Sequence, residues 1–318
     1  MASPLVTVIC LCYNHERFVE AAVESVVKQT YPSVQIIVWD DASTDGSAAV
    51  IRNLQLKYPQ IEVTLSEKNE GNCRAFNRAY ALAKGEFIID FATDDVMHER
   101  RVEKQIEFFN TADDRTGVVF TDATYIDDGG NFIRHHYEYL FKHKLIRDIP
   151  TGDVFRSVLT TYYIASPTMM MRRCVLDELG GYDEQLSYED FDLWVRSSRI
   201  FRYGFVNERL CFIRLVSDSL SAGQYRKRSI HLRSTYLVCL KALEVCRDSD
   251  DVEAVVQRTR YELRQATLSD NPAVALMFWK VLHDKKRNRF ADNFWKVIGQ
   301  LHIPLSGARQ LYLRLRYG

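Results

Sequence analysis

Residues 5–41 have the sequence LVTVICLCYNHERFVEAAVESVVKQTYPSVQIIVWDD. Two segments of this stretch, residues 5–12 and 34–39, are short, apolar and rich in β-branched residues, which is typical of strands buried on both faces. Between them apolar residues recur at helical spacing until a Tyr-Pro pair ends the helix: Phe18, Ala22 and Val26, then Tyr31-Pro32. A strand, a helix and a second strand in this order predict two parallel strands joined by a crossover helix.

The alternation of strand and helix continues to about residue 126. The further strands are expected at 61–65, 86–91 and 118–126, and the further helices around 50–58, 76–83 and 102–109. Repeated units of this kind predict an α/β fold, in which helices cover both faces of a mainly parallel central sheet.

The pattern changes twice in the second half of the chain. Residues 131–150 follow a glycine-rich turn and lack clear periodicity, so we expect a long loop there. From Tyr225 onward the pattern is helical. We therefore expect an α/β core at 1–224 and a helical C-terminal extension at 225–318.

The composition excludes several classes of protein. Of the 318 residues, 47% are hydrophobic and 26% charged, which argues against disorder. Lys and Arg (42) balance Asp and Glu (42), so we expect no nucleic-acid partner. The seven cysteines are scattered, which favours a reducing compartment over a disulfide framework. Since no signal peptide and no apolar run of ~20 residues is present, we expect a soluble, cytoplasmic protein.

Polar and acidic residues follow three of the expected strands, where ligands bind in open α/β sheets. They are Tyr13-Asn14, Asp40-Asp41 and Thr93-Asp94-Asp95. No glycine-rich phosphate loop follows the first strand, so a phosphate-bearing ligand needs another counter-charge. Adjacent carboxylates that hold Mg²⁺ or Mn²⁺ would supply it. Helix capping is the alternative; it explains Asp45 better, whereas metal binding explains Asp94 and Asp95 better.

At this point the sequence resembles the family 2 glycosyltransferases of GT-A fold, in the non-processive branch that uses nucleotide sugars. The resemblance extends from about Val6 to about Leu220 and rests on six motifs in the family's order: VTVICLCYN, QTYP, DDASTDGS, NEGNCRAFNRAYALAKGEF, ATDD and GGYDEQLSYEDFDLW. It implies a Rossmann-like GT-A core with a nucleotide-sugar part at about 1–127 and an acceptor part at about 128–224.

The resemblance also implies roles for residues on the donor side. Tyr13 would stack on the nucleobase, and Asp41 would accept a hydrogen bond from the imide N–H of uracil or thymine. Asp94 would lie near the ribose, and Asp95 on the diphosphate and a divalent cation, Mn²⁺ or Mg²⁺. Arg74 stands where family members often carry a basic residue near the donor.

On the acceptor side, Asp190 matches the family's catalytic base, with Glu189 beside it, and Trp194 would help to shape the acceptor pocket. A charge at a helix N-terminus is an equally good explanation of Glu189. The expected reaction is a single displacement with inversion at the anomeric carbon. Asp190 would take the proton of the acceptor hydroxyl, and the cation would stabilise the departing nucleoside diphosphate.

Two positions depart from the family pattern. Ala92 stands where many members carry the first Asp of the metal motif, and Val216 stands where many carry a histidine. Fewer carboxylates would then hold a cation, and the sequence alone does not decide whether the protein requires a metal. These departures support a second hypothesis, a non-catalytic member that binds a nucleotide or a glycan within an assembly.

The leading hypothesis is an inverting enzyme that moves one sugar from a nucleoside-diphosphate sugar, with UDP or dTDP favoured. The acceptor would be a hydroxyl of a glycan or of a lipid-linked molecule, and the resemblance places the reaction in bacterial surface polysaccharide synthesis. The Gln-x-x-Arg-Trp motif and membrane spans that processive synthases carry are absent from this sequence. We therefore expect one sugar per encounter.

Residues 285–318 carry eight basic residues and one acidic residue, interleaved with apolar ones. The basic residues are Lys285, Lys286, Arg287, Arg289, Lys296, Arg309, Arg314 and Arg316, and the apolar residues are Phe290, Phe294, Trp295, Ile298, Leu305, Leu311, Tyr312 and Leu315. This pattern is typical of an amphipathic helix that lies in a membrane interface, here at the inner face of the membrane. The favoured alternative is that the apolar side packs on the core or on a second copy of the chain.

Overall fold

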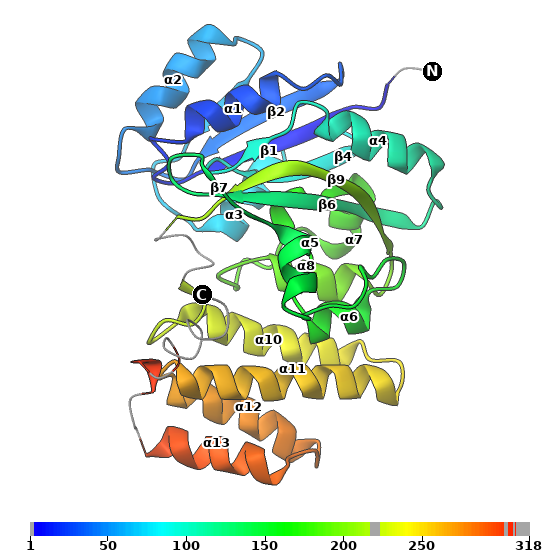
Figure 1. Ribbon diagram of the computed structural model, residues 1–318. Coiled ribbons are helices and arrows are strands. Elements are labelled where there is room, and N and C mark those ends of the chain that lie inside the picture. The colour runs from blue at the N-terminus through cyan, green and yellow to red at the C-terminus, as the bar shows by residue number, and fades with distance from the viewer. Residues whose placement is uncertain (1–2, 217–222, 302–304, 308, 310–318) are drawn as a thin grey trace. The chain divides into compact units, whose positions relative to one another are not determined.

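The computed structural model describes residues 3–216, 223–301, 305–307 and 309 (Figure 1). The chain divides into two compact units. The first unit takes residues 1–154, 163–184 and 200–215, and the second takes 155–162, 185–199 and 216–318. The helices after residue 225 therefore share a unit with two segments from the expected core. A domain boundary at residue 224 stays a prediction.

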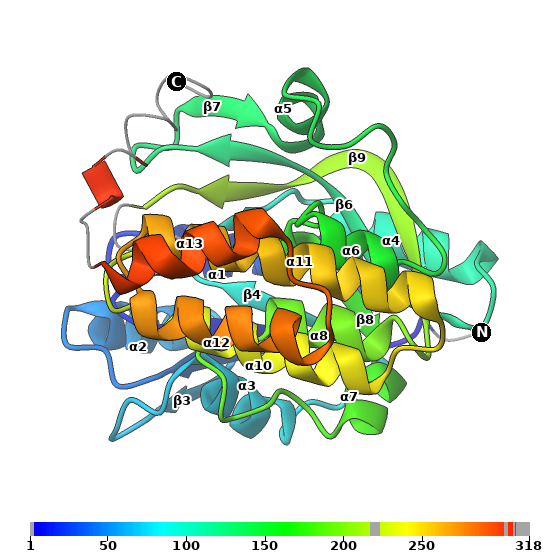
Figure 2. The ribbon, with the colours of Figure 1, turned by 90° about the horizontal axis from the view of Figure 1, so that it is seen from below.

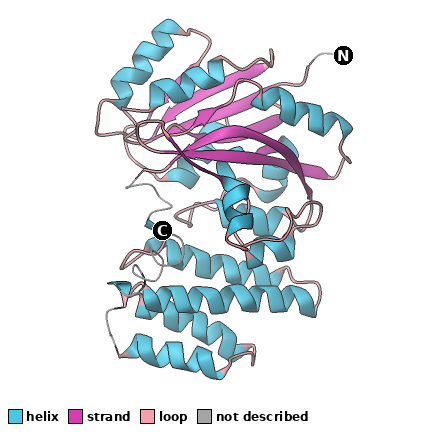
Figure 3. Cartoon of the chain, in the orientation of Figure 1, coloured by secondary structure: helices cyan, strands magenta, loops and turns pink. Residues whose placement is uncertain are grey.

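The first unit contains a nine-stranded sheet with the order β3-β2-β1-β4-β8-β6-β9-β5, and β7 pairs with β6. The strands, magenta in Figure 3, are β1 (Val6–Cys12), β2 (Val34–Asp40), β3 (Glu62–Leu65), β4 (Phe87–Ala92), β5 (Val96–Met97), β6 (Thr116–Ile126), β7 (Phe132–His135), β8 (Met170–Arg172) and β9 (Arg202–Arg214). Neighbours pair in parallel from β3 to β4, and so do β6 and β9. β8 is antiparallel to both β4 and β6 and joins these two parallel parts.

Helices cover both faces of this sheet, as the strand–helix alternation predicts. They are α1 (Val19–Val27), α2 (Ser47–Lys57), α3 (Asn72–Tyr80), α4 (Arg101–Thr111), α5 (His136–Lys142), α7 (Arg173–Leu179) and the short 3₁₀ helix η1 (Ser166–Thr168). Figure 1 shows α1, α2 and α4 on one face and α3 and α7 on the other. The main apolar core lies under α1, α2 and α4, and it includes Cys10 and Cys12, which behave as small buried hydrophobic residues.

The expected loop at residues 131–150 is wrong in its first part, because β7 and α5 lie there. β7 has only four residues, of which Phe132 and Ile133 are exposed. It pairs with the end of β6, where the register shifts between Tyr125 and Ile126. A strand this short, with apolar residues facing solvent, does not produce the alternation of polar and apolar residues that predicts a strand.

In the described residues of the second unit, helices are the regular elements and no strand is present. Its helices are α6 (Phe155–Thr160), α8 (Asp190–Ser197), α10 (Ile230–Glu244), α11 (Ser249–Leu268), α12 (Pro272–Asp284) and α13 (Phe290–Gln300). The last four lie side by side in Figure 2. Among the helices in the described ranges, none combines the length and the apolar character that a bilayer crossing requires. The predicted α/β fold and the predicted helical C-terminal region are both confirmed.

Candidate active site

Three strand ends of the first unit meet at one edge of the sheet. β1 pairs in parallel with β2 on one side and with β4 on the other. The pairing continues past the strands, because Asp41 N donates to Cys12 O at 2.9 Å, and Thr93 N donates to Leu11 O at 3.0 Å. The structure thus brings together the predicted donor-side residues that follow these ends: Tyr13, Asp41, Asp94 and Asp95.

Tyr13 is half exposed at this edge, with 46% of its surface accessible. Its neighbour Asn14 has a positive φ of 59°, a conformation that Asn adopts more readily than most residues. The Asn14 N–H donates to Ser43 Oγ at 2.8 Å, and its Oδ1 accepts from Thr44 N at 2.8 Å. The turn after β1 is therefore held in shape by the turn after β2, and it presents an exposed aromatic ring that could stack on a base.

Asp41 is buried, and its carboxylate holds the start of α3. Its Oδ1 accepts the N–H of Glu70 at 3.0 Å, and its Oδ2 accepts the N–H of Gly71 at 2.9 Å. Gly71 has a φ of +86°, which glycine adopts without strain. A carboxylate has about four acceptor positions, so a further donor such as a nucleobase imide N–H can still bind.

Asp94 and Asp95 differ in their surroundings. Asp95 is 3% exposed, and its Oδ1 accepts the N–H of Arg214 at 2.8 Å. Asp94 is half-buried, and its carbonyl oxygen accepts Arg214 Nε at 2.9 Å. Burial raises the pKa of the Asp95 carboxyl well above its usual range, and the charge of Asp94 adds to the rise, while the N–H and the charge of Arg214 oppose it.

The pair fits a divalent cation, because a cation would relieve the repulsion between the two carboxylates. In the described part of the chain, no three His, Cys, Asp or Glu side chains are grouped as metal ligands. Asp94 and Asp95 would therefore supply only part of a coordination shell, and diphosphate oxygens and water would complete it. Asp94 has the more accessible carboxylate, since Asp95 already accepts a main-chain N–H.

Arg214, the last residue of β9, contacts both acids of this pair and is a candidate site residue that the sequence did not reveal. Besides its contacts with the two acids, its Nη1 donates to Asp127 O at 2.8 Å and to Asp128 O at 3.2 Å. Its guanidinium also lies 4.7 Å from the centre of the Phe18 ring. In the sequence, Arg214 stands two positions before Val216, where many members of the family carry a histidine. Its position at the end of the last core strand was the available signal.

Arg74 lies in the first part of α3, after the turn that Asp41 holds. Its half-exposed side chain approaches Glu184, with Nε 3.4 Å from Oε2. Asn77 of the same helix donates to Tyr182 O at 2.9 Å and accepts from Tyr182 N at 2.9 Å. α3 therefore anchors the GGYDE part of the last motif, and Arg74 remains partly available to an anionic ligand.

The acceptor-side residues lie in the second unit. Asp190 is the first residue of α8, and Glu189 precedes it with a helical backbone and no side-chain cap. Both are half-buried. Trp194 is 4% exposed and packs on Tyr162 with 5.8 Å between ring centres. Packing is therefore the visible role of Trp194, and contact with an acceptor stays a prediction.

Comparison with known protein sequences identifies relatives of this chain. The profile of the family described as "Glycosyl transferase family 2" matches residues 7–180. An uncharacterized glycosyltransferase of Methanocaldococcus jannaschii, MJ1057, is 27% identical over 235 residues, which are 73% of this chain and 78% of that protein. Chondroitin synthase of Escherichia coli is 26% identical over 214 residues, 67% of this chain. The chain matches only 29% of that synthase.

Solved structures share the fold. S. aureus TarS 1–349 in complex with UDP-GlcNAc superposes with a TM-score of 0.65 at 18% identity, covering 88% of this chain and 80% of that one. The mannosyltransferase PcManGT from Pyrobaculum calidifontis, in complex with GDP-Man and Mn²⁺, superposes with a TM-score of 0.62 at 16% identity, covering 98% and 88%.

Proposed function

The chain belongs to glycosyl transferase family 2 and is a glycosyltransferase with a GT-A fold, and from this premise we propose that it transfers one sugar from a nucleoside-diphosphate sugar to an acceptor hydroxyl, with inversion. The observation that carries the proposal is the edge of the sheet at which an exposed aromatic ring and three carboxylates come together. These residues are Tyr13, Asp41, Asp94 and Asp95.

The donor we favour is a UDP- or dTDP-sugar. Tyr13 offers a ring to the base, and Asp41 has acceptor capacity left for an imide N–H, which uracil and thymine have and cytosine lacks. The structural neighbours bind different nucleotides, UDP-GlcNAc in TarS and GDP-Man in PcManGT, so the choice of base rests on Asp41.

A divalent cation, Mn²⁺ or Mg²⁺, would be held between the Asp94–Asp95 pair and the donor diphosphate. Asp95 would be the principal ligand of the cation, and the accessible carboxylate of Asp94 would be a second one. When bound, the cation supplies positive charge that stabilises the departing diphosphate. Binding would also favour the ionised form of Asp95, whose pKa is raised by burial.

The reaction needs a single base. The acceptor oxygen bonds to the anomeric carbon while the bond from that carbon to the diphosphate oxygen breaks, and Asp190 takes the hydroxyl proton. Attack opposite the leaving group inverts the anomeric centre. Glu189 would assist by orienting the acceptor, and Arg74 would add positive charge near the donor phosphates.

The acceptor would be a glycan or a lipid-linked molecule, in polysaccharide synthesis. The similarity to a chondroitin synthase supports a polysaccharide setting, although the chain matches less than a third of that protein. A lipid-linked acceptor would require the enzyme to work at a membrane surface.

The distribution of exposed apolar and basic residues on and before α13 (Phe290–Gln300) supports a membrane contact. The outward side of the helix carries an apolar stripe at helical spacing: Phe290 (88% exposed), Phe294 (50%), Val297 (50%) and Leu301 (61%). Exposed cations precede the helix: Lys285, Lys286, Arg287 and Arg289. This arrangement suits an amphipathic helix on an anionic leaflet. The predicted tail residues Leu311, Tyr312, Arg314, Leu315 and Arg316 lie outside the described residues.

The non-catalytic hypothesis keeps Ala92 and Val216 as its support, and a transfer assay separates it from the enzyme. A panel of UDP-, dTDP- and GDP-sugars is screened for transfer or slow hydrolysis, with Mn²⁺ and with EDTA. We expect turnover of at least one donor, with loss of rate in EDTA. Failure of the folded protein to turn over any donor, although it binds the nucleotide, would support the non-catalytic hypothesis.

The same assay tests the base. Asp190→Asn is nearly isosteric but cannot accept the proton, so we expect kcat to fall by roughly 10²-fold or more with unchanged affinity for UDP. Glu189→Gln is the neighbouring control and should retain more activity. An Asp190→Asn enzyme that works at the wild-type rate would remove Asp190 from the mechanism.

A further inference from the structure

The acidic segment at the start of α8 is held by one helix of the same unit. Ser187 N donates to Ser234 Oγ at 2.9 Å, and Ser187 Oγ lies 2.8 Å from His231 Nδ1. The Tyr188 hydroxyl lies 2.6 Å from Thr235 Oγ1. All three partners belong to α10. The residues just before the proposed base are thus tied to α10 by specific polar side chains.

A further contact lies just beyond the proposed base. Lys241 Nζ of α10 donates to Asp192 Oδ1 at 2.7 Å, and Arg196 Nε donates to Asp192 Oδ2 at 2.7 Å. Asp192 is 1% exposed, so its charge requires such cationic partners. α10 therefore contacts the chain on both sides of Asp190.

The hydroxyl of Thr235 has partners on three sides. It lies 3.0 Å from His231 O within α10, and it accepts from Gln224 Nε2 at 3.1 Å. Its third partner is the Tyr188 hydroxyl, and one donor and two acceptor positions suffice for all three contacts. Thr235 is fully buried, where a hydrogen bond of this kind restricts the position of its partner.

These contacts come from one face of α10. The residues that make them are His231, Ser234, Thr235 and Lys241. A helix face that served packing alone would be apolar, because buried hydroxyl groups destabilise a fold unless they are hydrogen-bonded. The polar face thus specifies where its partner lies, in addition to burying surface.

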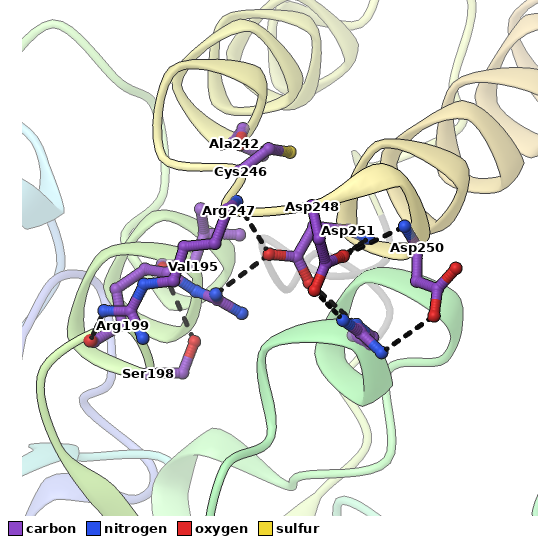
Figure 4. Close-up of polar contacts among 10 residues, drawn as sticks. Val195, Ser198, Arg199, Ala242, Cys246, Arg247, Asp248, Asp250 and Asp251 are labelled. Carbon is purple, nitrogen blue, oxygen red and sulfur yellow. Dashed lines mark hydrogen bonds and ion pairs between the residues drawn. The ribbon is translucent and has the colours of Figure 1, made fainter.

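The other end of α8 is anchored as well (Figure 4). Arg199 donates to Asp251 Oδ2 at 3.0 Å, and the same oxygen accepts Arg247 N at 2.9 Å. Arg156 donates to Asp251 Oδ1 at 2.7 Å. Asp251 is 1% exposed and lies in the first turn of α11. Helices α10 and α11 therefore hold α8 at both ends.

We propose that the polar face of α10 positions Asp190, so that this face of the helical C-terminal region supports the proposed base. This inference rests on the proposed function, in which Asp190 is the base. The positioning residues are Ser234 and His231, which act through Ser187. Thr235 acts through Tyr188, and Lys241 acts through Asp192. A displacement of about 1 Å at a reacting group lowers rates by up to roughly 100-fold, so these contacts govern kcat.

The test compares two buried threonines with the same local bond. Thr259 of α11 is also fully buried and donates to the carbonyl four residues earlier, Val255 O, at 2.8 Å. Thr235→Val and Thr259→Val each remove one hydroxyl without changing the shape. We expect Thr235→Val to lower kcat about tenfold with unchanged donor KM, and Thr259→Val to leave kcat unchanged at a comparable Tm.

Two further variants separate positioning from folding. Thr235→Ser keeps the hydroxyl but loses the methyl group, so we expect it to regain most of kcat even where its Tm lies below that of Thr235→Val. Tyr188→Phe removes the hydroxyl on the other side of this contact and should match Thr235→Val, and the double variant should lose no more than either one.

The outcomes are distinguishable from those of the proposed function. Equal kcat in Thr235→Val and wild type, with Asp190→Asn inactive, would overturn the positioning role alone. A kcat that follows the Tm across Thr235→Val, Thr235→Ser and Thr259→Val would overturn it as well. Full activity of Asp190→Asn would instead reject the base assignment, and the inference with it.

Discussion

The carboxylates at the edge of the sheet and the acidic segment of α8 are held in place by different chemical groups. Asp41 and Asp95 accept main-chain N–H groups, those of Glu70, Gly71 and Arg214. A main-chain N–H is present whatever side chain its residue carries, proline excepted. The geometry of the first site therefore depends on strand register and turn shape.

The segment around Asp190 is held by side chains of α10 instead. Each of these contacts disappears when one residue is changed. The comparison teaches that two groups of proposed functional residues can differ in tolerance. Side-chain substitutions that leave the main chain in place, such as Glu70→Ala, should be mild for Asp41, whereas substitutions on the polar face of α10 should be costly to activity.

The largest effect that sharpens this comparison is expected at Asp41. Asp41→Ala removes an ionised acceptor, so affinity for UDP should fall by about tenfold or more, whereas CDP should lose much less. Glu70→Ala is the matched control: it keeps the N–H that Asp41 accepts, so UDP affinity should stay at the wild-type value. Calorimetry with both nucleotides measures this. Equal losses for UDP and CDP would contradict recognition of the base by Asp41.

A smaller effect concerns stability and pH at Asp95. Its folded pKa is raised above the usual value of 3.8, so the ionised form destabilises the fold at higher pH, and protonation relieves this as the pH falls through the raised pKa. Asp95→Asn should thus have the higher Tm at pH 8, and the difference should shrink as the pH falls toward 4.

Scanning calorimetry across this pH range, without metal, is the measurement. Asp94→Asn serves as the control, since that half-buried carboxylate should change Tm less. A gap between wild type and Asp95→Asn that widens on acidification would contradict the assigned direction. Mn²⁺ with UDP should raise the Tm of wild type more than that of Asp95→Asn, because the ligand stabilises the folded state that binds it.

The smallest effect, on membrane binding, is expected for α13. This helix exposes an apolar side, whereas α10 buries a polar one. Phe294→Asp should weaken flotation with anionic vesicles several-fold at low salt, and leave transfer to a soluble acceptor unchanged. Leu56→Asp, at an 81% exposed position of α2 in the other unit, is the control. Unchanged flotation of Phe294→Asp, or dimerisation that Phe294→Asp abolishes, would favour packing on a second copy.

Much of the sheet, and the edge at which the candidate site residues meet, followed from local patterns. The apolar segments at 5–12 and 34–39 are β1 and β2, and the polar residues that follow β1, β2 and β4 meet because parallel neighbours end at the same edge. The sequence did not predict β7 and α5, because these elements have too few residues for a periodic pattern to show. It did not predict the contacts of Arg214 with Asp94 and Asp95 either, because they join residues more than a hundred positions apart.

Repeating polar and apolar spacing, together with turn residues and family motifs, was sufficient to identify an α/β glycosyltransferase; its donor-side acids stay a prediction. The spacing in α10 likewise indicates which side chains share a face. It cannot indicate what that face meets, because Ser187 and Ser234 are 47 positions apart and neither residue type implies the other. That contact, and with it the support of Asp190, arises only when distant segments pack together, since packing selects among many faces of equal local preference.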